Sequence, residues 1–338
     1  MVDTNCEHCG GAGEFDPQLA FARLSKRHEA LADVMSRFMV ATTVSPASLS
    51  NSNARNETAD VMSRFMAATT VSPVSLSNSN ARNETTADLM REFQRIVGGK
   101  PTLGFPDCCL VGHRGSNGAI GWFCSGVLIH PQIVLTAGHC FLPSNRANVV
   151  ALSANDQNQL GQAELVNIRR LAVHPTYTQT RQMSDITVII LRTPAQTVPV
   201  SIATTAELAV AMSVTLVGFG NEDVNSTKGF GLKREVEVDV TNIRRSAADD
   251  LDADEHQLGF ESDLEFVAGG KGFDTCNGDS GGPVYLRANG TVKLAGLTSR
   301  ATETATHKCG DGGIYTRVDV HLKFIRQIAS DAGIGNPP

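Results

Sequence analysis

The segment CNGDSGGP, residues 276–283, places Ser280 among three glycines. Glycine adopts backbone dihedral angles that other residues avoid, so a tight loop is expected here, with the serine hydroxyl and the neighbouring backbone amides exposed along it. Acyl transfer to a serine needs a hydroxyl, a base that takes its proton, a carboxylate that orients the base, and amide donors for the developing oxyanion. This loop offers the hydroxyl and the amides.

Two further segments offer the base and the carboxylate. LTAGHC at residues 135–140 carries His139, and SDITVIIL at residues 184–191 places Asp185 at the head of an apolar strand. Taken singly, His139 could equally be a core histidine and Asp185 a strand-end cap. Taken together, the three motifs in the order His, Asp, Ser predict a catalytic site with a nucleophilic serine.

The chain beyond residue 95 has an all-β pattern, in which short β-branched runs alternate with glycine-rich turns. Helical periodicity is confined to its end, where VDVHLKFIRQIAS places Leu322, Ile325 and Ile328 on one face. We therefore expect one terminal helix that closes the domain. The strand-like runs are GWFCSGVLI, QIVLTAGHC, DITVIIL, MSVTLVGFG, REVEVDV, GPVYL and TVKLAGLTS.

With IVGG at residues 96–99, the three motifs resemble the chymotrypsin/trypsin family of serine proteases in their order and intervals. The resemblance runs from Ile96 to the C-terminal helix. It implies an all-β fold of two packed antiparallel β-barrels with a C-terminal helix, and a catalytic triad at their junction. The first barrel would span about 96–205 and the second about 206–338, within a peptidase domain of residues 96–338.

The resemblance also implies a role for each residue of the site. Ser280 would attack the peptide carbonyl, His139 would take the serine proton and pass it to the leaving amine, and Asp185 would hold the imidazole tautomer. The backbone amides of Gly278 and Ser280 would bind the oxyanion.

Arg95 directly precedes IVGG, and in this family cleavage of that bond frees an α-amino group. By resemblance, the ammonium of Ile96 would then pair with Asp279, since a buried carboxylate is costly without a partner. Residues 1–95 would be a pro-region, and an enzyme that cuts after basic residues could activate itself. The alternative is that Arg95 is a linker residue and IVGG an ordinary strand start.

In the family that the chain resembles, the residue at the base of the primary specificity pocket lies six positions before the nucleophile, and here that residue is Asp274. A carboxylate at the base of the primary pocket implies a preference for Arg or Lys, unless this aspartate is paired elsewhere. Gly313 matches a pocket-wall glycine, and Ser299 matches the strand that pairs with substrate. Ala301 stands where a second glycine is usual and would narrow the entrance. Arg300 replaces a usual tryptophan and would favour acidic residues near the scissile bond.

Four cysteines match the disulfides of the family by resemblance. Cys124 would pair with Cys140 beside the histidine, and Cys276 with Cys309 beside the pocket. Both bonds would brace short functional loops.

The other four cysteines have no such match. Cys108 and Cys109 are adjacent on a predicted strand, so a bond between them would be strained. CEHCGGAG at residues 6–13 is similar to one quarter of the zinc-binding region of DnaJ-type chaperones, but a closed zinc site needs four ligands, so no metal is expected. A link from this segment to Cys108 or Cys109 would tether the pro-region after cleavage.

The N-terminal region contains a tandem repeat. Residues 32–58 recur almost unchanged as residues 59–85, and each copy joins a short apolar segment to a tract rich in Ser, Asn and Thr. Because so little apolar surface cannot form a core, we expect residues 1–95 to be largely disordered with short helices. The alternative is that the repeated helices dock on a partner or inhibit the peptidase domain.

Composition restricts the partners and the compartment. The net charge of −6 over 338 residues and the sparse aromatics give no reason to expect nucleic acid or a membrane as a partner. The N-terminus lacks the apolar core of a secretory signal. The expected disulfides nevertheless favour a secreted or extracytoplasmic protein.

The sequence therefore predicts a serine endopeptidase that cleaves after Arg or Lys and is made as a zymogen. It needs no cofactor, and its partners would be polypeptide substrates, with protein inhibitors and an activating protease as further candidates. The alternative is a non-catalytic binding protein that uses a protease scaffold and the N-terminal repeats. A third interpretation is that the protease serves only to release those repeats.

Overall fold

The computed structural model describes residues 99–141, 146–222, 229–307, 309–335 and 337. All of them belong to one compact unit, residues 82–338. Both copies of the repeat, the segment CEHC, Arg95 and Ile96 lie outside the described residues.

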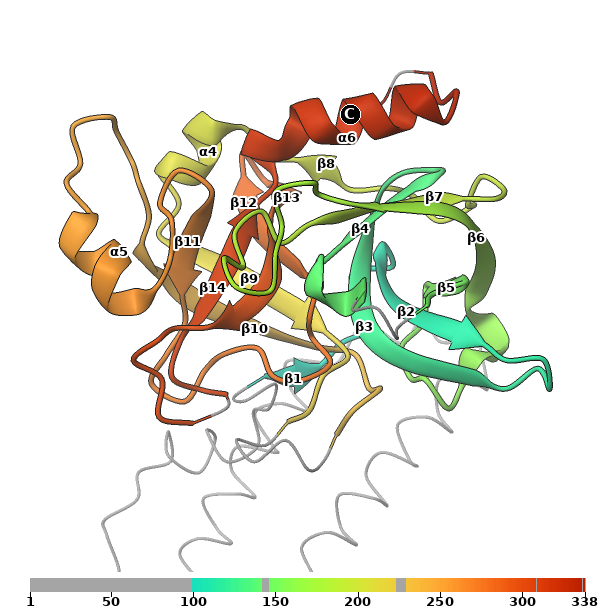
Figure 1. The fold of residues 1–338 in the computed structure, drawn as a ribbon. Helices are drawn as coiled ribbons and strands as arrows, with labels where there is room; N and C mark the ends of the chain where they lie inside the picture. Colours follow the sequence, from blue (N-terminus) through green and yellow to red (C-terminus); the bar gives the residue numbers. More distant parts are fainter. Residues whose placement is uncertain (1–98, 142–145, 223–228, 308, 336, 338) are drawn as a thin grey trace, which may run out of the picture. The chain divides into compact units, whose positions relative to one another are not determined.

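Six antiparallel strands of the first half form a closed barrel, in the order β2-β3-β4-β7-β6-β5. It is coloured from cyan to yellow-green in Figure 1. Its strands are β2 (Cys108–Arg114), β3 (Ile120–His130), β4 (Ile133–Thr136), β5 (Val149–Leu152), β6 (Glu164–Val173) and β7 (Thr187–Leu191).

Strands β4, β5 and β7 of this barrel are buried along their whole length. Successive side chains of a strand point to opposite sides, and in β7 Ile189 and Leu191 join a cluster made only of first-barrel residues. Val188 and Ile190 join a second cluster that also contains residues of the other half of the chain. An unbroken run such as TVIIL is therefore explained by a strand that is covered on both sides.

Six strands of the second half form another antiparallel ring, β9-β10-β11-β14-β13-β12, which closes because β10 and β12 both pair with β9. Two short strands are added to it, β1 (Lys100–Pro101) beside β10 and β8 (Ser201–Ile202) beside β13. The ring strands are β9 (Ser213–Gly218), β10 (Arg234–Asn242), β11 (Glu265–Ala268), β12 (Pro283–Ala288), β13 (Thr291–Ala301) and β14 (Gly313–Arg317).

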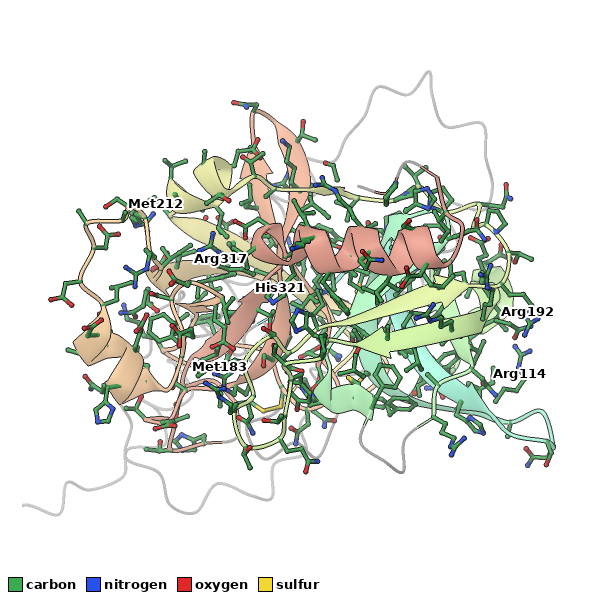
Figure 2. All side chains as sticks on the ribbon, turned by 45° about the horizontal axis from the view of Figure 1, so that its top comes forward. Arg114, Met183, Arg192, Met212, Arg317 and His321 are labelled. Atoms are coloured by element: carbon green, nitrogen blue, oxygen red, sulfur yellow. A yellow bond between two sulfur atoms is a disulfide. The ribbon has the colours of Figure 1, made fainter. Side chains whose placement is uncertain are left out.

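Helices are few in the described part of the chain. The longest, α6 (Leu322–Asp331), buries Ile325, Ile328 and Ala329 in the cluster that lies between the barrels. His321, labelled in Figure 2 at the start of this helix, donates from its ring Nδ1 to the carbonyl of Arg317 at 2.7 Å. The expected fold of two barrels and a terminal helix is thus confirmed. The remaining helices are α4 (Thr205–Ala209), α5 (Asp252–Leu258) and the 3-10 turns η2 (His139–Phe141), η3 (Leu160–Gln162) and η4 (Asp319–His321).

None of the helices that the structure describes is long and apolar enough to span a membrane.

Candidate active site

His139 and Asp185 are brought together by the pairing of β4 with β7. Thr136 at the end of β4 lies opposite Thr187 at the start of β7, so the residues just beyond these strand ends meet. The imidazole Nδ1 of His139 lies 2.7 Å from Oδ2 of Asp185, and the backbone amide of His139 donates to Oδ1 at 2.8 Å. Two hydrogen bonds therefore fix the ring relative to the carboxylate.

Asp185 is buried, and its carboxylate has a third donor. The hydroxyl of Ser299, on β13 of the second barrel, donates to Oδ2 at 2.7 Å. Burial by itself would raise the pKa of Asp185, but the hydrogen bonds from His139 and Ser299 outweigh it and lower that pKa. The group is thus held as a carboxylate that can stabilise an imidazolium.

The loop of Ser280 is held against the first barrel by Ser125 of β3. The amide of Ser125 donates to the carbonyl of Ser280 at 2.9 Å, and its hydroxyl donates to the carbonyl of Gly278 at 2.9 Å. Gly281 packs so closely that an added Cβ would lie 2.5 Å from the amide nitrogen of Ala137, two residues before His139. The candidate nucleophile therefore lies beside the histidine segment.

Glycine is required at position 278. Its φ of 98° is in the left-handed region, and an added Cβ would lie 2.5 Å from the ring of Phe230. Both carbonyls flanking Asp279 face Ser125. Within the described part of the chain, neither the amide of Gly278 nor that of Ser280 donates a hydrogen bond. Two amides are thus available for an oxyanion.

Asp279 is completely buried, at 0% exposure. Its carboxylate accepts hydrogen bonds from the amides of Gly220 at 2.7 Å and Cys276 at 2.8 Å. Burial raises the pKa of Asp279 to about 7. Added Cβ atoms at Gly218 and Gly220 would lie 2.1 Å and 2.5 Å from carboxyl atoms, so the backbone encloses this group closely. Both of these hydrogen bonds come from neutral donors.

Asp274 is a second buried carboxylate, and it is hydrogen-bonded to its neighbours. Its Oδ1 accepts from the Tyr315 hydroxyl at 2.8 Å and from the Thr275 amide at 2.6 Å, and burial raises the pKa of Asp274 to about 6. An added Cβ at Gly313 would lie 2.7 Å from this oxygen. Ala301 of β13 pairs with Gly313 of β14, which brings Ala301, Gly313 and Asp274 together.

Arg300 differs from expectation. Instead of a free cation, its guanidinium forms an ion pair at 2.6 Å with Glu265 at the start of β11. The sequence singled out neither Glu265 nor Ser125. Each acts through a partner that is distant along the chain, so no local pattern marks it.

Both expected disulfides are present, Cys124–Cys140 and Cys276–Cys309. The first joins β3 to the histidine segment, and the second joins the serine loop to the segment before β14. Cys108 and Cys109 are free and fully buried. Their side chains belong to clusters on opposite faces of β2. The cysteines of the CEHC segment lie outside the described residues, so the tether stays a prediction.

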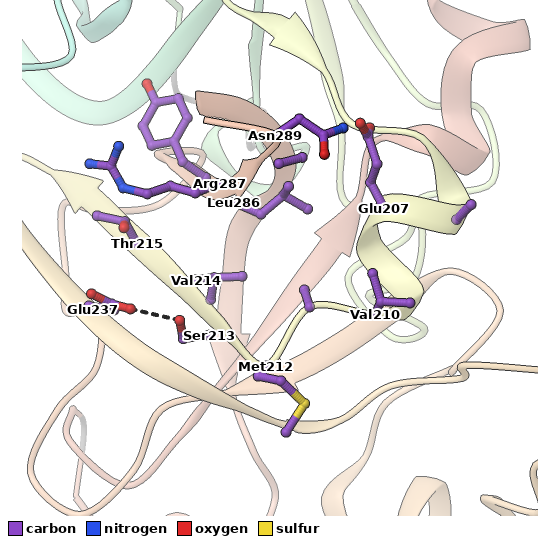
Figure 3. A pocket seen from close by; sticks show the side chains of 14 residues that line it. Glu207, Val210, Met212, Ser213, Val214, Thr215, Glu237, Leu286, Arg287 and Asn289 are labelled. Atoms are coloured by element: carbon purple, nitrogen blue, oxygen red, sulfur yellow. Dashed lines mark hydrogen bonds between the residues drawn. The ribbon is translucent and has the colours of Figure 1, made fainter. Parts of the chain in front are cut away.

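A cavity of about 520 Å³ lies elsewhere, between α4 and strands β9, β10 and β12 (Figure 3). Exposed Val210 and Met212 are among its lining residues, and on the wall formed by β9 and β10 Ser213 donates to Glu237 at 2.7 Å. None of its lining residues belongs to the candidate triad or to the group around Asp274. The chemistry described above is therefore separate from this cavity.

Comparison with known proteins agrees with this geometry. The family model described as Trypsin matches residues 96–325. The chain is 33% identical over 222 residues to vitamin K-dependent protein C of Rattus norvegicus, covering 62% of this chain and 47% of that protein. It is 32% identical over 216 residues to a tryptase of Mus musculus (60% and 77%), and 28% over 211 residues to a trypsin of Saccharopolyspora erythraea (61% and 86%). The chain thus spans about half the length of the protein C that it matches.

Proposed function

Because this chain belongs to the trypsin family of serine proteases, we propose that it is an endopeptidase that hydrolyses peptide bonds with Ser280 as its nucleophile. The observation that carries the proposal is the carboxylate of Asp185, which holds the ring of His139 at 2.7 Å beside the Ser280 loop. A non-catalytic binding protein on this scaffold would need neither this carboxylate nor free amides at residues 278 and 280.

The hydrogen bond to Asp185 determines how His139 works. Nδ1 must carry a proton to donate to the carboxylate, so Nε2 is left as the base. Nε2 takes the Ser280 proton as Oγ attacks the peptide carbonyl, and it then protonates the leaving amine. Water repeats the sequence on the acyl-enzyme and releases the acid. Asp185 stays ionised throughout and stabilises the imidazolium.

The oxyanion is proposed to bind the amides of Gly278 and Ser280. Ser125 supports this role because it binds the carbonyls of Gly278 and Ser280 and so holds the loop against the first barrel. The two amides share peptide groups with the carbonyls of Asn277 and Asp279, which accept hydrogen bonds from the amides of Asn221 at 2.9 Å and Gly282 at 2.7 Å, so their orientation is fixed. Donors held in place before the reaction stabilise the developing charge without reorganisation.

We propose that Asp274 binds the side chain of Arg or Lys before the scissile bond. The carboxylate is buried, so it gains most from a cationic partner. Ser299, Ala301 and Gly313 would form the walls of that pocket and pair with the substrate backbone.

Cleavage selectivity is expected to depend on pH. Because the pKa of Asp274 is raised to about 6, this group is charged above pH 6 and loses its charge as the pH falls through that value. The ratio of kcat/KM for an Arg-ended peptide to that for its citrulline-ended analogue should therefore fall by roughly tenfold between pH 8 and pH 5. A ratio of the two cancels the pH dependence of the triad itself. In Asp274→Ser the Arg-to-citrulline ratio should be low at every pH. If the wild-type ratio did not change with pH, Asp274 would not be the group that binds the basic side chain.

We also propose that residues 1–95 form a pro-region and that residues 96–338 form the peptidase domain, released by cleavage of the Arg95–Ile96 bond. The buried carboxylate of Asp279 supports this proposal. Since both of its described donors are neutral amides, an ammonium group from Ile96 would compensate its charge and order the loop of Gly278 and Ser280.

Partners and compartment follow from the same proposal. The partners would be polypeptide substrates, an activating protease and protein inhibitors. The two disulfides favour an oxidising, extracytoplasmic compartment.

A further inference from the structure

Arg300 is bound on several sides by acceptors of the protein. Its Nη1 lies 2.6 Å from Oε1 of Glu265, and its Nη2 lies 2.9 Å from Oε2 of the same carboxylate. Nη2 also donates to the carbonyl of Gly259 at 2.8 Å, and Nη1 to the carbonyl of Gln182 at 3.3 Å. A guanidinium has five N–H donors in a rigid fork, and this arrangement uses most of them.

Glu265 is as dependent on Arg300 as Arg300 is on Glu265. It is 0% exposed, and its Oε2 accepts a further bond from the amide of Glu261 at 3.0 Å. A buried carboxylate is costly unless it is paired and hydrogen-bonded, and the two parallel bonds from a guanidinium are the strong form of that pairing. The two residues therefore form a unit with no net charge.

This unit lies beside the residues of the proposed reaction. Arg300 follows Ser299, whose hydroxyl donates to Asp185 at 2.7 Å. It precedes Ala301, which pairs with Gly313 next to Asp274. A peptide whose basic side chain reaches Asp274 and whose carbonyl reaches Ser280 would pass this part of β13.

We propose that Glu265 and Arg300 form a specificity-determining pair, in which Glu265 cancels the charge of Arg300 so that the neighbouring subsite does not discriminate between charged and uncharged side chains. This inference rests on the proposed endopeptidase function. It replaces the expectation of a preference for acidic residues, because the cation that would attract them is already bound.

Paired peptides test the charge of this subsite directly. Two Arg-ended chromogenic peptides, identical except for Glu or Gln at the position before the Arg, are compared at pH 8. In the wild type, the Glu-to-Gln ratio of kcat/KM should lie within about twofold of 1, as expected where no net charge faces the substrate. A wild-type ratio of ten or more would overturn the proposal.

Single substitutions should move this ratio in opposite directions. Glu265→Gln leaves the cation uncompensated, so the ratio should rise by roughly tenfold, whereas Arg300→Gln leaves the anion and should lower it by a similar factor. The double variant, Arg300→Gln with Glu265→Gln, is the matched control and should return the ratio to near 1. If Glu265→Gln does not fold, the Arg300→Gln and double variants still decide the question. Unchanged ratios in the folded variants would overturn the proposal.

A second readout separates this inference from the proposed function. The same substitutions are made in Ser280→Ala, and equilibrium binding of fluorescent versions of the two peptides is measured by anisotropy. If the wild type shows no turnover, the endopeptidase proposal fails, while the binding ratios still test the pair. If turnover depends on Ser280 but neither substitution changes the Glu-to-Gln ratio, only the proposal of a specificity-determining pair is overturned. Absence of both turnover and binding would overturn both.

Discussion

Replacing Ser280 with alanine is expected to lower kcat/KM for an Arg-ended peptide on the order of 10⁵-fold, the scale at which a serine protease loses its nucleophile. The reason is that the hydroxyl forms the acyl bond, and no other described group is placed to form it. The orienting bonds between His139 and Asp185 do not involve the Ser280 side chain and should survive. The measurement is steady-state hydrolysis by protein cut after Arg95, before and after the substitution.

The control for this loss is a serine elsewhere. Ser330 on α6 is exposed and touches no part of the site, so Ser330→Ala should retain full activity. Both variants should unfold at the temperature of the wild type. Hydrolysis by a folded Ser280→Ala protein at more than about a hundredth of the wild-type rate would mean that another group attacks the substrate.

Blocking the activation bond should have the second-largest effect. In Arg95→Gln, a protease that cuts after basic residues no longer recognises the bond, so Ile96 keeps its amide and offers no ammonium to Asp279. The Gly278 and Ser280 amides would then be less well ordered. Since one oxyanion donor contributes about 10²–10³-fold to kcat, the uncut protein should be slower than the cut protein by at least that factor.

The comparison requires a way to cut the variant at the same bond. If the residues that end at position 95 are replaced with the recognition sequence of another protease, that protease can cut just before Ile96 on demand. Activity should then return on cleavage. Full activity in the uncut protein, checked by N-terminal sequencing, would show that Asp279 needs no ammonium from Ile96.

The parts of the site that the sequence predicted are those with strong local motifs. The loop around Ser280 requires glycine at a left-handed position, and the segments of His139 and Asp185 join strands whose apolar runs identify them. Each of these constraints acts within a few residues, so a short sequence motif is enough to predict it. The all-β pattern and the amphipathic terminal helix were predicted on the same basis.

The parts that the sequence did not predict depend on contacts across the fold. Glu265 stands in an ordinary strand, and its partner Arg300 is 35 residues away. The expectation that Ser299 pairs with substrate did not include the bond from its hydroxyl to Asp185, 114 residues away. Ser125 holds the Ser280 loop from the other barrel. Such roles arise from contacts between segments that are distant along the chain, within one barrel or between the two, so no spacing within one segment marks them.

The measurement that tests the central claim most directly is covalent labelling of the protein cut after Arg95. A fluorophosphonate reacts with a serine only where a base accepts its proton and amides stabilise the phosphoryl oxygen. Peptide mapping by mass spectrometry should find one adduct, on Ser280. The adduct should be much weaker in the uncut protein and absent in His139→Ala. A folded, fully cut protein that carries no adduct on Ser280 would contradict the account.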